Sequence, residues 1–249
     1  MQSLRHRDLH SEHEPHVVFQ ASTIGALLDG AYDGDVTFAE LAEHGDLGLG
    51  TINGLDGEMI AVDGRFLRAD IEGTTSALDG SDRTPFAVVV WFTPTERIEI
   101  RGPASQEEVL AAVDDRLPAT AVACALRIEG HFDHVKARSV PKQNRPYRPL
   151  AEVVADQHVF DLEDVEGTIV GFRFPDYSQG IEVSGYHLHF ASADRARGGH
   201  VLDFRVRDAR VQIDPSADLH LELPSGIDLD APDLSASTAA ALARVEHSD

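Results

Sequence analysis

The stretch SGYHLHFASADRARGGHVLDF contains three histidines whose spacing suits a single metal ion. Residues two apart in a β-strand share a face, so His187 and His189 are predicted to project to the same side. If the chain reverses at Asp194 and Arg195, His189 lies opposite His200. Directly opposed Cβ atoms in paired strands are about 5 Å apart, which is close enough for both side chains to bind one ion. The spacing is therefore compatible with a metal site made of His187, His189 and His200.

The ligand set itself indicates the kind of metal site. Three neutral imidazoles without a fourth protein ligand are typical of a catalytic zinc ion that keeps open positions for substrate. Nitrogen donors of this kind also accept other divalent metals, including iron, nickel and copper. A second interpretation is three half-buried strand histidines that bind no metal. The spacing alone leaves both interpretations open.

The segments around these histidines are predicted to be mostly strands. Short strand-like runs, LGLGTING, GEMIAVDGRFLRAD and PFAVVVWF, are separated by Gly and Asp turns, and Asp63-Gly64 predicts a two-residue hairpin turn. Meandering strands mixed with a few short helices predict an α+β fold with mixed and antiparallel sheets. We expect two packed halves, at about residues 16–140 and 141–249, after a disordered, polar tail at residues 1–15.

Three helices are predicted in the first half. HVVFQASTIGALLDG indicates a strand that leads into a short helix, with Ser22 or Thr23 as its N-cap. VTFAELAEHG predicts a second short helix that ends at Gly45. SQEEVLAAVDDRLP is the clearest amphipathic helix, and Pro118 is expected to end it.

The second half is predicted to repeat this mixture of strands and helix. TAVACALRIEGHFDHVKARSV indicates two strands, PLAEVVADQHVFDLEDV a helical stretch and GTIVGFRFP a further strand. GYHLHFASADRARGGHVLDFRVRDARVQID indicates two or three long strands joined by turns. His131 and His134, in EGHFDH, are expected at the surface or behind the site.

Composition restricts the partners and the location of the protein. The chain has 43 acidic and 21 basic residues, a net charge of −22, which repels phosphate backbones and anionic lipids. Nucleic acid and membranes are therefore not expected as partners. The N-terminus has no apolar core typical of a secretion signal, and the single Cys124 cannot form an intrachain disulfide. We expect a cytoplasmic protein whose partner is a small molecule.

Several motifs together are similar to one known family. GYHLHF followed by GGHVLDF, with LDGEMIAVDG, RSVPKQNRPYRPL and GTIVGFRFPDY upstream, resembles the alpha-acetolactate decarboxylase family in sequence and in order. The matches run from about His16 to the C-terminal tail, and GYHLHF with GGH is highly specific. The resemblance implies a zinc enzyme, usually a homodimer, whose two α/β halves pack together. It also implies that His187, His189 and His200 bind the zinc ion.

The resemblance further implies the remaining site residues and the reaction. It places Thr51 of GTING at the substrate, with Arg138 of KARSV, and makes Glu58, Arg138 and Glu246 catalytic. The implied reaction is decarboxylation of 2-acetolactate (2-hydroxy-2-methyl-3-oxobutanoate) to acetoin and CO2, a step of acetoin biosynthesis, with zinc stabilising an enediolate. Arg138 would bond an oxygen that stays anionic, while Glu58 and Glu246 would hold a proton, position a water or deliver a proton.

Two alternatives belong to other classes of function. A cupin-type dioxygenase with a three-His metal commonly has a Glu a few residues after the histidine pair, whereas FASADRA offers only Asp194. A non-catalytic metal- or ligand-binding module would not need Glu58, Arg138 and Glu246 beside three histidines. Metal analysis together with an acetoin assay would separate the three possibilities.

Overall fold

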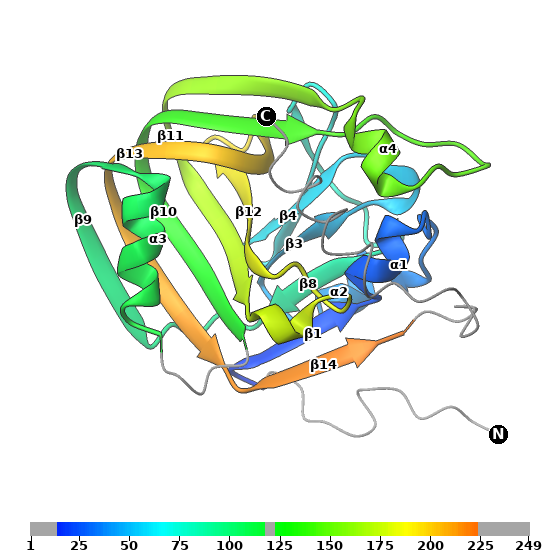
Figure 1. Cartoon of the computed structure of the whole chain (residues 1–249), viewed down its shortest axis with the longest axis horizontal. Coiled ribbons are helices and arrows are strands. Elements are labelled where there is room, and N and C mark those ends of the chain that lie inside the picture. Colours follow the sequence, from blue (N-terminus) through cyan, green and yellow to red (C-terminus); the bar gives the residue numbers. More distant parts are fainter. Residues whose placement is uncertain (1–13, 118–122, 224–249) are drawn as a thin grey trace.

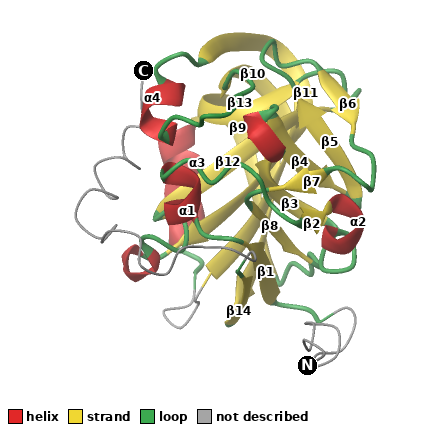
Figure 2. Ribbon diagram, turned by 90° about the vertical axis from the view of Figure 1, so that its right-hand side faces the viewer, coloured by secondary structure: helices red, strands yellow, loops and turns green. Residues whose placement is uncertain are grey.

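The computed structural model describes residues 14–117 and 123–223 of the 249-residue chain. Most of the N-terminal tail expected at residues 1–15, together with Pro118 and Glu246, lies outside these ranges. None of the helices within the two ranges is long and apolar enough to span a bilayer. Two large β-sheets dominate the molecule, with short helices at their margins (Figures 1 and 2).

The first sheet has seven strands and is built mainly from the N-terminal part of the chain. Its order is β14 (Asp218–Glu222), β1 (Val17–Ala21), β8 (Ala87–Val90), β3 (Leu47–Thr51), β4 (Glu58–Val62), β5 (Arg65–Ala69) and β6 (Thr75–Ala77). β14 pairs parallel with β1, and the other neighbours are antiparallel. A separate pair consists of β2 (Val36–Thr37) and β7 (Arg83–Thr84).

The second sheet consists of long antiparallel strands. Its order is β10 (Ala123–Ser139), β11 (His158–Phe174), β12 (Gly185–Ser192), β13 (Gly198–Ser216) and β9 (Glu96–Ser105). β10 also pairs with β13, so the strands from β10 to β13 close into a ring. The strands therefore change sheets between residues 90 and 96, and β14 returns to the first sheet (Figure 1). The α+β fold with mixed and antiparallel sheets is confirmed.

Several predictions of local structure were wrong, and the first concerns β10. The stretch predicted as two strands is one strand, Ala123–Ser139. Gly130, in its centre, looked like a turn residue. A Cβ at Gly130 would lie 2.2 Å from the carbonyl oxygen of Asp208, so this glycine is required by the close approach of β13.

The second wrong prediction concerns the segment after β10. The helical stretch is only α4 (Leu150–Val154), and β11 begins at His158. Phe160 and Leu162 are buried between more exposed neighbours. This alternation has the two-residue period of a strand and overrides the helical propensity of the sequence.

The short helices are set by local capping. Thr23 caps α1 (Ile24–Leu28), as predicted, and Ser105 caps α3 (Gln106–Asp114). Thr37 caps α2 (Phe38–Leu41) in a capping box, but this helix ends at Leu41, with Ala42 as its C-cap, and the predicted end at Gly45 was wrong. A Cβ at Gly45 would lie 2.5 Å from the amide nitrogen of Val90, so Gly45 serves the approach to β8 instead. The residues that the structure describes also form two 3₁₀ turns, η2 (Asn53–Leu55) and η3 (Asp176–Ser178).

A shared hydrophobic core fixes the two sheets relative to each other. Leu49 and Ile60 of the first sheet belong to the same buried cluster as Val170 and Phe172 of β11. A second cluster lies within the second sheet and under α3, and a third lies between the first sheet and α2. Residues on facing strands of the two sheets can therefore form one site with fixed geometry.

Candidate metal and substrate site

The three predicted ligands come together at the hairpin between β12 and β13. His189 pairs with His200 in the register, and His187 lies two residues before His189 on the same face. The pairing is centred on Asp194 and Arg195, as the sequence predicted, and Arg195 adopts a positive φ of 57° in the turn. The prediction of the reversal is therefore confirmed.

The three imidazoles are close enough to bind one ion. Their ring centroids are 5.1, 5.1 and 5.2 Å apart, and each ring can offer a nitrogen within 4.8 Å of the other two. His200 Nδ1 lies 3.3 Å from His189 Nε2. Two nitrogens bound at the usual zinc distance in a tetrahedral site would be about 3.4 Å apart. This buried group of His187, His189 and His200 could bind a metal ion.

Burial keeps the imidazoles of His187 and His189 in the neutral form that a metal requires. Burial lowers the pKa of His189 to about 3 and holds the pKa of His187 well below its usual value, with His189 and Arg138 adding to the latter effect. His189 Nδ1 donates a hydrogen bond of 2.8 Å to the Met59 carbonyl oxygen, which leaves Nε2 with its lone pair for a ligand. His187 Nδ1 is buried with no hydrogen-bond partner in the part of the chain that the structure describes. These observations fit a metal site.

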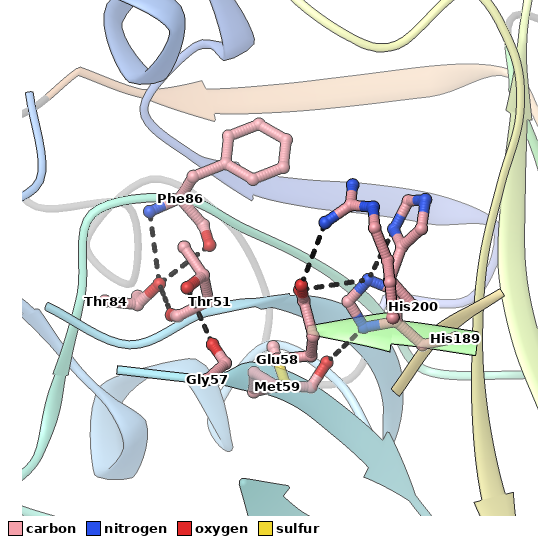
Figure 3. Close-up of polar contacts among 9 residues, drawn as sticks. Thr51, Gly57, Glu58, Met59, Thr84, Phe86, His189 and His200 are labelled. Carbon is pink, nitrogen blue, oxygen red and sulfur yellow. Dashed lines mark hydrogen bonds and ion pairs between the residues drawn. The ribbon is translucent and has the colours of Figure 1, made fainter. Parts of the chain in front are cut away.

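Arg138 and Glu58 form a buried ion pair. Figure 3 shows Glu58 beside His189 and His200. Arg138 of β10 pairs with His200 in the register, so His200 lies between Arg138 and His189 on one face. Arg138 Nη1 donates to Glu58 Oε1 at 3.2 Å, and Glu58 Oε2 lies 3.6 Å from His189 Nε2. Burial raises the pKa of Glu58 to about 7, and the opposing effect of Arg138 is smaller. A carboxyl group with this pKa can both release and accept a proton near neutral pH.

Thr51 lies opposite Glu58 in the pairing of β3 with β4. Its hydroxyl donates to the carbonyl oxygen of Gly57 at 2.8 Å. The hydroxyl of Thr84 lies 2.7 Å from the Thr51 carbonyl oxygen and 2.8 Å from that of Phe86 (Figure 3). Because the hydrogen of the Thr51 hydroxyl is already donated to Gly57, the hydroxyl oxygen can only accept a hydrogen bond from a ligand.

These residues line one pocket that has two chemically different sides. We call one the polar side, and it consists of Thr51, Glu58, Arg138, His187, His189 and His200. We call the other the apolar side, and it consists of Ile24, Leu27, Leu55, Phe86, Val140 and Leu150. Sequence reasoning missed the apolar side. Its only signal, the i, i+3 spacing of Ile24 and Leu27, does not distinguish a pocket residue from a core residue.

Other predicted residues lie elsewhere. Glu246 is outside the described residues, so its position relative to the pocket stays a prediction. His131 and His134 lie on β10, where they contact Asp164 and Asp161 at 3.0 and 2.7 Å. Both histidine side chains are partly exposed, which agrees with one of the two placements expected from the sequence. Cys124 is buried, as its apolar surroundings indicated.

Known proteins resemble this chain over most of its length. The sequence profile of a family described as alpha-acetolactate decarboxylase matches residues 18–236. Alpha-acetolactate decarboxylase from Methylococcus capsulatus is 50% identical over 220 residues, which cover 88% of this chain and 85% of that protein. The protein of the same name from Bacillus subtilis strain 168 is 42% identical over 221 residues, 87% of each chain. A crystal structure of alpha-acetolactate decarboxylase from B. subtilis strain 168 superposes with a TM-score of 0.89 and 39% identity, over 93% of this chain and 100% of that one.

Proposed function

The chain belongs to the alpha-acetolactate decarboxylase family and is a decarboxylase, and from this premise we propose that it converts 2-acetolactate to acetoin and CO2 with a zinc ion bound by His187, His189 and His200. The observation that carries the proposal is the buried three-His group beside the ion pair of Glu58 and Arg138. The pocket combines groups suited to an anionic substrate that loses CO2. The arginine would stabilise negative charge, the carboxyl group of raised pKa would transfer a proton, and the metal would act as a Lewis acid.

Zinc is the metal that this donor set favours, although other divalent metals are compatible with three imidazoles. A bound ion would supply a Lewis acid for the substrate's oxygens. The contribution of the protein is to hold three neutral nitrogens in place. The hydrogen bond from His189 to the Met59 carbonyl oxygen fixes the ring orientation and the tautomer for this purpose.

Arg138 is proposed to stabilise charge that remains after CO2 has left. A donor that bound only the carboxylate would stabilise the group that must depart and so would oppose the reaction. A buried guanidinium that also bonds an oxygen of the enediolate would act on the transition state instead. The burial of Arg138, which is 4% exposed, supports this role because a low dielectric strengthens such bonds.

Glu58 and Glu246 are proposed to carry protons. Loss of CO2 leaves an electron pair that is delocalised toward the ketone, and acetoin forms when a proton is added to carbon. Glu58, with its pKa of about 7, suits either the proton of the substrate hydroxyl or this final proton. Glu246 is proposed as the second acid–base group on the family resemblance, and Thr51 as an acceptor for the substrate.

Family membership favours the decarboxylase over a cupin-type dioxygenase and over a non-catalytic binding module. Two further expectations, a homodimer and a cytoplasmic location, stay proposals. The homodimer rests on the family resemblance, and sedimentation of the purified protein would test it.

The test of the function is incubation of the purified protein with racemic 2-acetolactate, with CO2 release and the chirality of acetoin as readouts. We expect turnover that is lost after treatment with a chelator and restored by zinc. Metal analysis of the protein as purified gives a second readout. No acetoin from a zinc-loaded, folded protein would contradict the proposed function, and undiminished turnover without metal would contradict the role of zinc.

A further inference from the structure

The apolar side of the pocket has no role in metal binding or proton transfer. Its six side chains come from α1, η2, α4 and the chain just outside β8 and β10, and they line the same pocket as the histidines. Six apolar side chains in a pocket beside a candidate metal site favour a substrate that has an apolar part to lie against them.

The substrate of the proposed reaction supplies such a part, so the role of the apolar side rests on the proposed function. A 2-hydroxy-2-alkyl-3-oxo acid has a carboxylate, a hydroxyl and a ketone, and the polar side offers partners to all three. The remaining groups are two alkyl substituents, one on C2 and one on the ketone. Transfer of an alkyl group from water to an apolar surface lowers the free energy, so both substituents are expected to lie against the apolar side.

Leu27 of α1 and Leu150 of α4 lie on α-helices that pack against each other, and α1 also contributes Ile24 to this side. Leu27 and Leu150 are each 5% exposed. α1 is anchored at its start, where the amides of Ile24 and Gly25 donate to the carbonyl oxygens of Ile181 and Gly180 at 3.0 and 3.1 Å.

α4 is anchored in a similar way. The segment that leads into it is fixed by a hydrogen bond of 2.8 Å from the Tyr32 hydroxyl to the Arg148 carbonyl oxygen. Because α1 and α4 are both held at their N-terminal ends, they cannot easily move outward to make room for a larger ligand. They also cannot close a space that a smaller side chain leaves, so the pocket size should follow the side chains at positions 27 and 150.

We propose that Leu27 and Leu150 set the upper size of the alkyl substituent on C2 of the substrate. The enzyme then accepts a methyl group and discriminates against longer chains, because the leucines meet the end of the chain. One extra methylene that does not fit a pocket lowers kcat/KM by about 10- to 200-fold. Shortening either leucine should shift this limit upward.

The chain offers matched controls on the same helices. Leu28 follows Leu27 in α1 and Val154 lies in α4; both are buried in the same hydrophobic cluster, and neither lines the pocket. Their truncation to alanine leaves a cavity in the core but does not enlarge the pocket. It therefore reports the effect of lost stability alone.

The experiment compares Leu27→Ala and Leu150→Ala with Leu28→Ala and Val154→Ala. The substrates are 2-hydroxy-3-oxobutanoates with methyl, ethyl and n-propyl groups on C2, and kcat/KM is measured for each. We expect the ratio of kcat/KM for n-propyl to that for methyl to rise by about tenfold or more in the pocket variants. The ratio should stay within about twofold of the wild-type value in the controls.

The outcomes separate this inference from the proposed function. If the wild type decarboxylates no member of the series, the proposed function fails. If it decarboxylates the methyl substrate but the ratio does not change in the pocket variants, or changes equally in the controls, the assignment of Leu27 and Leu150 is wrong. Should an alanine variant not fold, Leu27→Val and Leu150→Val remove one methylene and must shift the ratio in the same direction. Leu27→Phe, which fills space, must shift it the opposite way.

Discussion

The polar and apolar sides of the pocket are built from different kinds of structure. The residues of the polar side all lie on strands, namely on β3, β4, β10, β12 and β13. The apolar side instead uses α1, α4, η2 and the chain just outside β8 and β10. Strand register fixes which side chains meet, and the ladder His189–His200–Arg138 is held by paired backbones on both sides. The apolar side can change its side chains without a change of register.

This difference indicates a division of tasks. The proposed metal binding and proton transfer tolerate little displacement, and the residues proposed for them lie on the most rigid elements. Contact with an alkyl group tolerates larger displacements of the side chains, so short helices and connections are sufficient to position the apolar side. Substitutions on the polar side should therefore affect catalysis, and those on the apolar side should affect the choice of substrate.

The largest effect is expected for His189→Ala. Loss of one of three ligands should abolish metal retention and lower decarboxylation by at least about a thousandfold, because changes to the groups that merely orient a ligand already cost about 10- to 100-fold. Metal content by elemental analysis and CO2 release would measure this. The control is His134→Ala, which removes a partly exposed histidine of β10 and should retain metal and activity. Full activity of a metal-free His189→Ala protein would contradict the assignment.

An intermediate effect is expected for Arg138→Lys. Lysine keeps the charge but loses the planar fork of the guanidinium. We expect kcat to fall by about 10- to 100-fold and by more than KM rises, because the proposed bond strengthens in the transition state. Steady-state kinetics with 2-acetolactate give both constants. An increase confined to KM would show simple carboxylate binding instead.

The smallest effect is expected where the two sides meet, at Thr84. Its buried hydroxyl contacts the carbonyl oxygens of Thr51, on the polar side, and Phe86, on the apolar side. Thr84→Val removes this hydroxyl with little change of shape and should lower the free energy of unfolding by about 1–2 kcal/mol. KM should rise by less than about tenfold, because a tenfold change in binding corresponds to about 1.4 kcal/mol, which is the same range as the expected loss of stability.

Thr84→Ser is the conservative control, because it keeps the hydroxyl and should restore KM. Thermal unfolding and steady-state kinetics of both variants provide the readouts. If Thr84→Val changes neither KM nor stability, the hydroxyl does not link the two sides.

How well the sequence predicted each part depends on how local its signal was. The hairpin of His189 and His200 was predicted correctly because its turn and register lie within one short segment. The hairpin turn at Asp63 and Gly64 was also correct, since both residues have the positive φ that such a turn requires. The site residues Glu58 and Arg138 came from the family resemblance, because nothing in their neighbouring residues marks a buried ion pair.

The failures arose where distant contacts decided the structure. Position 130 requires glycine because β13 passes close to it, and the surrounding sequence gives no sign of this contact. Met59 orients His189 through its carbonyl oxygen, for which any side chain would serve. Leu27 and Leu150 have the same residue type as leucines of the core. Only the packing of the two helices reveals that they line the pocket.

The path of the chain from β13 to β14 has a consequence for the whole molecule. β13 begins beside the histidine pocket, runs the length of the second sheet and continues almost directly into β14, which lies beside β1 in the first sheet (Figure 1). A single run of backbone thus belongs to both sheets and carries His200. Neither sheet can lose its structure alone, so heat or denaturant should melt the molecule in one cooperative transition. Any ligand that binds at His200 would raise the midpoint of that transition for both sheets together.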